Sequence, residues 1–209
     1  MLNAVREPEL RQVVVLGWGG DTRAYRLPWP PSVRLFELAP FDAVAHAELA
    51  FARAGVRAAK GLLLRRVAAE DSLGWTERLL AAGFMPDRTS AWALQGLHTL
   101  SREALLEVML EVGEAAAVGS SLVGEVLLQD AETGLGAMLA GAGIQLQSWA
   151  PLQEVGASLG RTLVPEEQPR ALFSAAKTRV TGRQFEAMRE ELQRAEGDDI
   201  GEDGFADAP

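Results

Sequence analysis

VVVLGWGGD, residues 13–21, is the stretch of this sequence that predicts its fold. A short β-branched apolar run at 12–16 leads into a cluster of glycines, which is typical of a buried strand in a parallel sheet. Glycines after such a strand let a ligand approach the backbone where a larger side chain would clash. The pattern indicates a ligand site at the carboxyl end of the strand. A glycine turn that only closes the strand is the alternative.

Strand and helix patterns alternate outward from this stretch. Further strands are expected at 33–38, within 61–68, and at 90–95, 122–128, 144–149 and 171–178. Helices are expected at 42–54, 75–82, 102–118, 152–159 and 182–196. This alternation predicts an α/β fold with a mostly parallel sheet covered on both faces. The closing strands suggest an antiparallel strand added at an edge.

Four local expectations accompany this plan. Asp42 and Ser101 are the expected N-caps of the helices that follow them. PWPP at 28–31 predicts a turn or extended connection, with no helix directly after the glycine loop. The stretch 129–143 holds four glycines and is expected to be a loop or a loosely formed helix.

The composition excludes several kinds of chemistry. A chain of 209 residues suits one domain, and the 48% hydrophobic share can fill a core. The absence of cysteine rules out disulfides, thiol nucleophiles and cysteine-ligated metals, and fits a reducing compartment. No apolar run is long enough to span a membrane. The mixed-charge start, MLNAVREPELRQ, does not look like a signal or transit peptide.

The formal charge of −9 is concentrated at one end of the chain. Residues 196–209 hold six acidic residues and no Lys or Arg, so the other 195 residues have 23 acidic and 20 basic side chains. We therefore expect a folded domain over 1–196 and an acidic, disordered tail over 197–209. Arg65 and Arg66 are expected to be a solvated strand end. Nucleic acid is not expected as a partner.

Glu37 lies 20 residues after Gly17, at the predicted end of the second strand. An acid at this place can accept hydrogen bonds from a ribose diol. The dinucleotide fingerprint, however, requires glycine where Thr22 stands, and a pyrophosphate needs a helix N-terminus after the loop. The loop suits a ligand without phosphates better than NAD. A nucleotide-dependent oxidoreductase is therefore the weaker alternative.

LGWGGDTRAYRLPWP followed by VRLFEL resembles the leucine carboxyl methyltransferase family, a branch of the class I S-adenosylmethionine-dependent methyltransferases. The family's Asp-Thr-Arg-x-x-Arg-Leu run is matched by Asp21, Thr22, Arg23, Arg26 and Leu27. Its Phe-Glu strand end is matched by Phe36 and Glu37, and 79–97 is similar to the segment that leads into the fourth strand. The likeness covers about residues 12–128. The runs WALQGL and FELAP are similar to plant and algal members of the family.

The resemblance implies a class I methyltransferase (Rossmann-like) fold, with a seven-stranded, mostly parallel sheet and helices on both faces. It implies an S-adenosylmethionine-dependent O-methyltransferase that acts on a carboxylate or similar oxygen of a small molecule or a protein terminus. The residues expected to bind S-adenosylmethionine are Gly17, Trp18 and Gly19 at the methionine part, Asp21 and Arg23 in the matched motif, Glu37 at the ribose, Glu70 and Asp71 at the adenine, and Gln95 beside the sulfonium.

The sequence departs from the family's pattern at carboxylate positions. An expected aspartate falls on Ala39, an expected glutamate falls on Gln95, and an aspartate is replaced by Glu70. The family's helical segment before the first strand is also absent, so the chain is expected to be a truncated form or a branch without that lid. These departures motivate a second hypothesis, in which a weakened methyltransferase fold serves as a binding or scaffold module.

A carboxylate acceptor needs no general base, so catalysis would rest on positioning and desolvation. No catalytic residue and no metal ligand is therefore assigned. His46 is expected to be a surface or packed residue, while His98 follows the fourth strand near the expected pocket. The acceptor and the oligomeric state stay open. The expected location is the cytoplasm, or a plastid if an N-terminal segment is missing.

Overall fold

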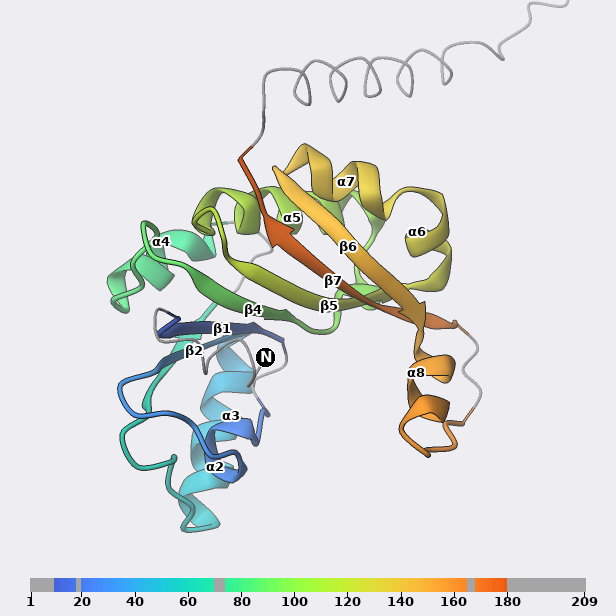
Figure 1. Cartoon of the computed structure of the whole chain (residues 1–209). Helices are drawn as coiled ribbons and strands as arrows, with labels where there is room; N and C mark the ends of the chain where they lie inside the picture. Colours follow the sequence, from blue (N-terminus) through green and yellow to red (C-terminus); the bar gives the residue numbers. More distant parts are fainter. Residues whose placement is uncertain (1–9, 18–19, 70–73, 165–167, 180–209) are drawn as a thin grey trace, which may run out of the picture. The chain divides into compact units, whose positions relative to one another are not determined.

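The computed structural model describes residues 10–17, 20–69, 74–164 and 168–179, and its strands and helices lie within the compact unit Met1–Thr178. Seven strands form one sheet in the order β3-β2-β1-β4-β5-β7-β6 (Figure 1). Their bounds are β1 Gln12–Leu16, β2 Arg34–Ala39, β3 Leu63–Ala68, β4 Ser90–Leu94, β5 Ser121–Leu127, β6 Ile144–Pro151 and β7 Arg170–Lys177. The first five strands pair in parallel, which confirms the predicted mostly parallel sheet.

Helices lie on both sides of this sheet. In Figure 1, α4 (Trp75–Ala81), α5 (Arg102–Ala115), α6 (Leu128–Thr133) and α7 (Leu135–Gly141) lie on one side, and α2 (Arg23–Arg26) and α3 (Phe41–Arg53) on the other. A 3-10 turn, η1, spans Leu97–Thr99, and α8 spans Leu152–Ser158. The helical segments expected around 42–54, 75–82, 102–118 and 152–159 are thereby confirmed.

Alternation along the central strand divides the core into two clusters. Val14 belongs to the cluster that α4, α5 and α7 cover, whereas Val13 and Val15 belong to the cluster beneath α2. All three side chains are buried, because adjacent residues of a strand point to opposite faces and both faces are covered here. The continuous apolar run in the sequence is therefore explained by its place at the middle of the sheet.

The antiparallel strand is not at an edge, contrary to the sequence prediction. β7 lies between β5 and β6 and pairs antiparallel with both of them. β6 thereby becomes the edge strand, and it runs parallel to the first five strands. Sequence patterns indicate which segments are strands, but the position of each strand in the sheet depends on packing between segments far apart in the chain.

Four local expectations have different outcomes. Ser101 caps α5 as expected, because its side chain accepts a hydrogen bond from the backbone N–H of Ala104. Asp42 is not a cap, since Pro40 holds the N-cap position and Asp42 lies in the first turn of α3. The stretch 129–143 contains most of two short helices, α6 and α7, which meet at Gly134. PWPP at 28–31 is a turn or extended connection as expected, but a single helical turn, α2, precedes it, where no helix was expected.

Candidate functional site

A cavity of about 520 Å³ opens at the carboxyl ends of β1, β2 and β4. Parallel strands end at the same edge of a sheet, so residues that follow different strands meet there. The residues lining the cavity are Val15, Gly17, Gly20, Asp21, Thr22, Arg23, Arg26, Glu37 and Gln95. Five predicted residues, Gly17, Asp21, Arg23, Glu37 and Gln95, are thus brought together around one space.

Gly17 and Gln95 line this cavity directly after β1 and β4, and this part of its lining is called its floor. The backbone N–H of Gly17 donates to Leu38 and that of Gln95 donates to Leu16, so the loop continues the hydrogen bonding of the sheet beyond β1 and β4. A Cβ atom at Gly17 would lie 3.0 Å from Oε1 and 3.2 Å from Cβ of Gln95. Glycine is therefore favoured at this position for space, since a side chain would displace Gln95 or enter the cavity.

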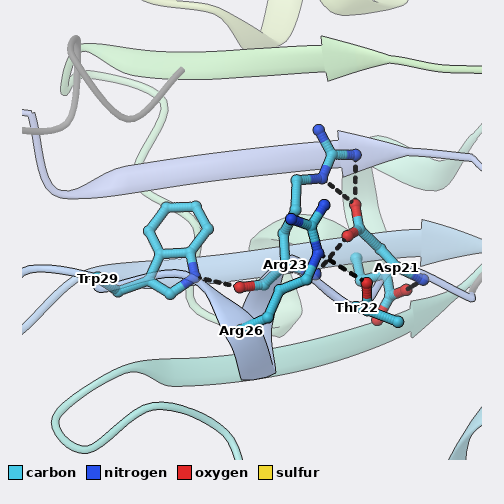
Figure 2. A network of polar contacts seen from close by, with 6 residues as sticks. Asp21, Thr22, Arg23, Arg26 and Trp29 are labelled. Atoms are coloured by element: carbon cyan, nitrogen blue, oxygen red, sulfur yellow. Dashed lines mark hydrogen bonds and ion pairs between the residues drawn. The ribbon is translucent and has the colours of Figure 1, made fainter.

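The loop after β1 is held by an ion pair between Asp21 and Arg23. Nε of Arg23 donates to Oδ2 of Asp21 at 2.6 Å, and the Nη2 atom of Arg23 approaches the same oxygen. Figure 2 shows the Arg23 side chain extending across β1 towards β4. Trp29 holds the backbone of Arg23, because its indole N–H donates to the Arg23 carbonyl at 2.7 Å. Contacts within the DTRAYRL motif, together with the one from Trp29, therefore fix this wall of the cavity.

Glu37 is the buried acid of the site, with 2% of its surface exposed. It lies within β2, two residues before the strand ends at Ala39, so its expected place at the strand end needs that correction. Its Oε1 accepts from the backbone N–H of Asp21 at 3.1 Å. Burial raises the pKa of Glu37 above its usual value, although the Asp21 hydrogen bond and the charge of Arg66 act in the opposite direction.

Arg66 is the residue that sequence reasoning missed. Its Nε donates to Oε2 of Glu37 at 3.0 Å, and its Nη2 donates to the Tyr25 hydroxyl at 2.6 Å. Its side chain is 11% exposed, so the interpretation of Arg66 as a solvated strand end is wrong, whereas Arg65 is exposed as expected. No local pattern in the sequence marks this pair, which arises from the register of the parallel strands, where Glu37 stands directly opposite Arg66.

A second cavity, of about 300 Å³, adjoins the first. It is lined by Arg23, Ala93, Leu94, Gln95, Val123, Gly124, Glu125, Leu172 and Phe173. Arg23 and Gln95 belong to the walls of both cavities. Val123 of β5 is 39% exposed here, so the described helices leave this part of the sheet face open.

The second cavity has an apolar wall and polar corners. Val123, Leu172 and Phe173 supply hydrophobic surface, while Gln95 and Arg23 supply hydrogen-bond donors where the two cavities meet. Glu125 already accepts from the backbone N–H of Gly96 and pairs with Arg170. The arrangement can accept a small apolar body that carries a polar or anionic group at the junction.

Other predicted residues lie elsewhere. Trp18, Gly19, Glu70 and Asp71, together with 182–196 and the 197–209 tail, fall outside the described residues. His46 is on the exposed surface of α3. The Nδ1 atom of His98 lies 3.4 Å from Oε1 of Glu125, and His98 lines neither cavity. Among the described residues, no cluster of His, Asp or Glu could hold a metal ion.

Solved methyltransferase structures share this fold. A protein of Bacillus halodurans, provisionally assigned as a methyltransferase, matches 84% of this chain and 96% of its own, at TM-score 0.53 and 12% identity. An O-methyltransferase from neocarzinostatin biosynthesis, solved with S-adenosylmethionine and a hydroxynaphthoic acid, matches 85% of this chain and 50% of its own, at TM-score 0.53 and 14% identity. These likenesses establish a class I methyltransferase fold.

Sequence relatives are methyltransferases as well. The chloroplastic O-methyltransferase 1 of Oryza sativa subsp. japonica is 31% identical over 94% of this chain and 58% of its own length. A protein of Parafrankia, provisionally assigned as an S-adenosyl-L-methionine-dependent methyltransferase, is 37% identical over 63% of this chain and 41% of its own. The chain thus spans about half the length of the curated relatives that it matches.

The described residues contain no helix with the length and apolar character needed to cross a membrane.

The sequence pattern of the family described as "Leucine carboxyl methyltransferase" matches residues 1–111, a little over half of the chain. This match includes the glycine loop, the DTRAYRL motif and the strand that carries Glu37. The chain belongs to the leucine carboxyl methyltransferase family of S-adenosylmethionine-dependent methyltransferases.

Proposed function

We propose that this chain binds S-adenosylmethionine in the 520 Å³ cavity and transfers its methyl group to a carboxylate or similar oxygen held in the second cavity. The observation that carries the proposal is that Arg23 and Gln95 stand in the walls of both cavities. A methyl donor and an acceptor held on either side of this junction would be adjacent, which in-line displacement requires.

The residues of the first cavity fit this cofactor. The volume lies in the range of small-molecule sites, and Gly17 leaves the floor free of a side chain. Glu37 presents a carboxylate to which ribose hydroxyls can donate. Arg26 lines the cavity and forms no ion pair in the described part of the chain, so its guanidinium can receive the cofactor's amino-acid carboxylate.

When bound, the cofactor supplies an electrophilic methyl carbon on a sulfonium, so an acceptor oxygen forms the new bond as the carbon–sulfur bond breaks and a thioether leaves. The chain's own residues would orient the acceptor oxygen towards the methyl carbon and remove water from around it. Arg23 can hold an acceptor oxyanion. Because Asp21 partly neutralises the charge of Arg23, the guanidinium would lower the nucleophilicity of that oxyanion less than an unpaired one. An acceptor that packs on Val123, Leu172 and Phe173 would displace water from these apolar side chains. No proton transfer is needed for a carboxylate acceptor.

Calorimetric titration with S-adenosylhomocysteine tests the proposal. We expect binding that NADH does not displace, and methyl-ester formation when S-adenosylmethionine and carboxylic acids are supplied together, followed by mass spectrometry. Absence of binding at millimolar S-adenosylhomocysteine would contradict the cofactor site. Failure of Gly17→Val to abolish binding would show that the ligand occupies another place.

A second candidate function is a binding or scaffold module with a weakened methyltransferase fold. The favouring observation is that the acids of the cavity are already engaged, since Asp21 pairs with Arg23 and Glu37 with Arg66. Ala39 at the end of β2 adds no carboxylate. S-adenosylhomocysteine binding without methyl transfer to any carboxylate or hydroxyl acceptor would favour this candidate over the enzyme.

The cell compartment and the excluded partners are also proposals. We propose a plastid location, for which the chloroplastic rice relative is the support, with the cytoplasm as the alternative. A fluorescent fusion of the full-length gene product distinguishes the two.

We propose further that nucleic acid is not a partner, because the formal charge is −9. Retention of the protein on a DNA column at low salt would contradict this.

A further inference from the structure

Arg66 reaches the candidate cofactor site only through Glu37. The Glu37 carboxylate lies in the cavity wall, whereas Arg66 is absent from that wall and lies behind Glu37 on the neighbouring strand. Two contacts beyond Glu37 hold Arg66 in place. Its Nη2 donates to the Tyr25 hydroxyl, and its guanidinium carbon lies 5.3 Å from the centre of the Phe51 ring.

These contacts join the cofactor loop to the rest of the domain. Tyr25 belongs to α2 and its ring lies 4.4 Å from that of Phe51 in α3, centre to centre. Through Glu37, Arg66 is connected to the backbone N–H of Asp21, which begins the motif after the glycine loop. A buried acid at a ribose site accepts more hydrogen bonds when it is ionised, because both of its oxygens are then free of a proton.

We propose that Arg66 is a positioning residue that keeps Glu37 ionised and aimed into the cavity, and so sets the pH range over which the nucleoside part of the cofactor binds. The proposal rests on the function proposed above. The charged and titratable groups around Glu37 in the described chain are Asp21 after β1, Arg23, Tyr25 and Arg26 of α2, and Arg66 of β3. Asp21 is paired with Arg23, so Arg66 is the cation that contacts Glu37.

The direction of the effect follows from burial. Desolvation is the largest influence on the pKa of Glu37 and raises it, while Arg66 lowers it. Removing Arg66 therefore raises the pKa further and protonates Glu37 at a higher pH. A protonated carboxyl accepts fewer hydrogen bonds, so ribose affinity should fall as the pH falls through this raised value.

The experiment measures S-adenosylhomocysteine affinity by calorimetry from pH 6 to pH 8, in wild type, Arg66→Met and the matched control Arg65→Met. We expect wild type and the Arg65 variant to change by less than about threefold over this range, and Arg66→Met to bind at least about tenfold more weakly at pH 6 than at pH 8. An analogue without the ribose hydroxyls should show no such dependence in any variant. If Arg66→Met follows the wild-type profile, the proposal is wrong.

Two further variants separate positioning from folding. Glu37→Gln combined with Arg66→Met should lose the pH dependence, because an amide does not titrate, and its persistence would exclude action through Glu37. Arg66→Lys keeps the charge without the two-pronged contact and should restore most of the wild-type profile. Arg66→Gln, which also removes the charge, replaces Arg66→Met should that variant fail to unfold cooperatively.

A measurement without ligand distinguishes this inference from the proposed function. The carboxyl carbon of Glu37, followed by NMR, should titrate at a higher pH in the Arg66 variant than in wild type. Equal values would overturn the inference whether or not the cofactor binds. Failure of wild type to bind S-adenosylhomocysteine, with the shift observed, would overturn only the proposed function.

Discussion

Gly17 shows how one residue limits what the candidate site can hold. Its backbone does not adopt a left-handed conformation, so the glycine is needed for space and not for flexibility. Gln95 is the neighbour that any side chain here would meet first. Because the Gln95 amide is the movable end of its side chain, small and large substitutions should differ in effect.

We expect Gly17→Ala to weaken S-adenosylhomocysteine binding by roughly three- to tenfold, because the new methyl displaces Gln95 by a few tenths of an ångström. Gly17→Val should abolish binding, since the branched side chain must enter the cavity itself. Calorimetry gives both affinities. Equal affinities for the alanine variant and wild type would show that Gln95 does not contact the ligand.

Arg26 carries the second prediction at this scale. It lines the cavity, and its Nε donates to the Thr22 hydroxyl at 3.0 Å (Figure 2). Arg26→Gln should weaken S-adenosylhomocysteine by about tenfold through the loss of one charge-assisted contact. Adenosine, which has no amino-acid part, should bind the variant as it binds wild type. Arg53→Gln, on the surface of α3, is the matched control and should change neither affinity.

Among the elements, α5 and α7 contribute most of the helical side of the larger core cluster. The two helices approach closely at Gly113, where a Cβ atom would overlap the backbone of Ala142. Gly141, by contrast, would place a Cβ atom in open space. The sequence predicts a helix around Gly113 and a loop or loosely formed helix around Gly141, and only the structure shows what a side chain at each position would meet.

We expect Gly113→Ala to lower the free energy of unfolding by about 1–3 kcal/mol, as overpacking does in well-packed cores. Gly141→Ala should raise it by up to about 1 kcal/mol, because alanine loses less entropy than glycine in a helix. Urea denaturation followed by circular dichroism measures both changes. A stabilising Gly113→Ala would mean that α5 and α7 are farther apart than in this structure.

At the scale of the whole molecule, the second cavity is built by strands that are distant in sequence. β4, β5 and β7 supply its walls, and β7 follows β4 by more than seventy residues. The insertion of β7 beside β5 places Leu172 opposite Glu125. The proposed acceptor site thus exists only because an antiparallel strand enters the interior of the sheet.

Leu172→Trp should fill the second cavity with an indole ring and reduce methyl-ester formation at least about tenfold. S-adenosylhomocysteine affinity should stay within about twofold of wild type, because Leu172 does not line the first cavity. The same substitution at the exposed Leu159 is the control. Loss of cofactor affinity in Leu172→Trp would show that the two cavities are not independent.

The sequence predicted all seven strands and most of the helices, because strand and helix periodicities are local properties of the chain. It also predicted Gly17, Asp21, Arg23, Glu37 and Gln95 as site residues, and the structure brings these five to one cavity. Their roles towards the cofactor stay predictions. Arg66 was misjudged because its partner stands 29 residues earlier, and only strand register brings the two together.

What the sequence determined by itself is therefore the set of strands, the glycine loop and the motif that identifies the family. These depend on residues within a few positions of one another, whose spacing decides which face they share. Only the tertiary structure decided the interior place of β7, the pairing of Glu37 with Arg66 and the adjoining of two cavities at Arg23 and Gln95. Those features depend on burial and hydrogen bonding between distant segments, whose energies exist only once the sheet has formed.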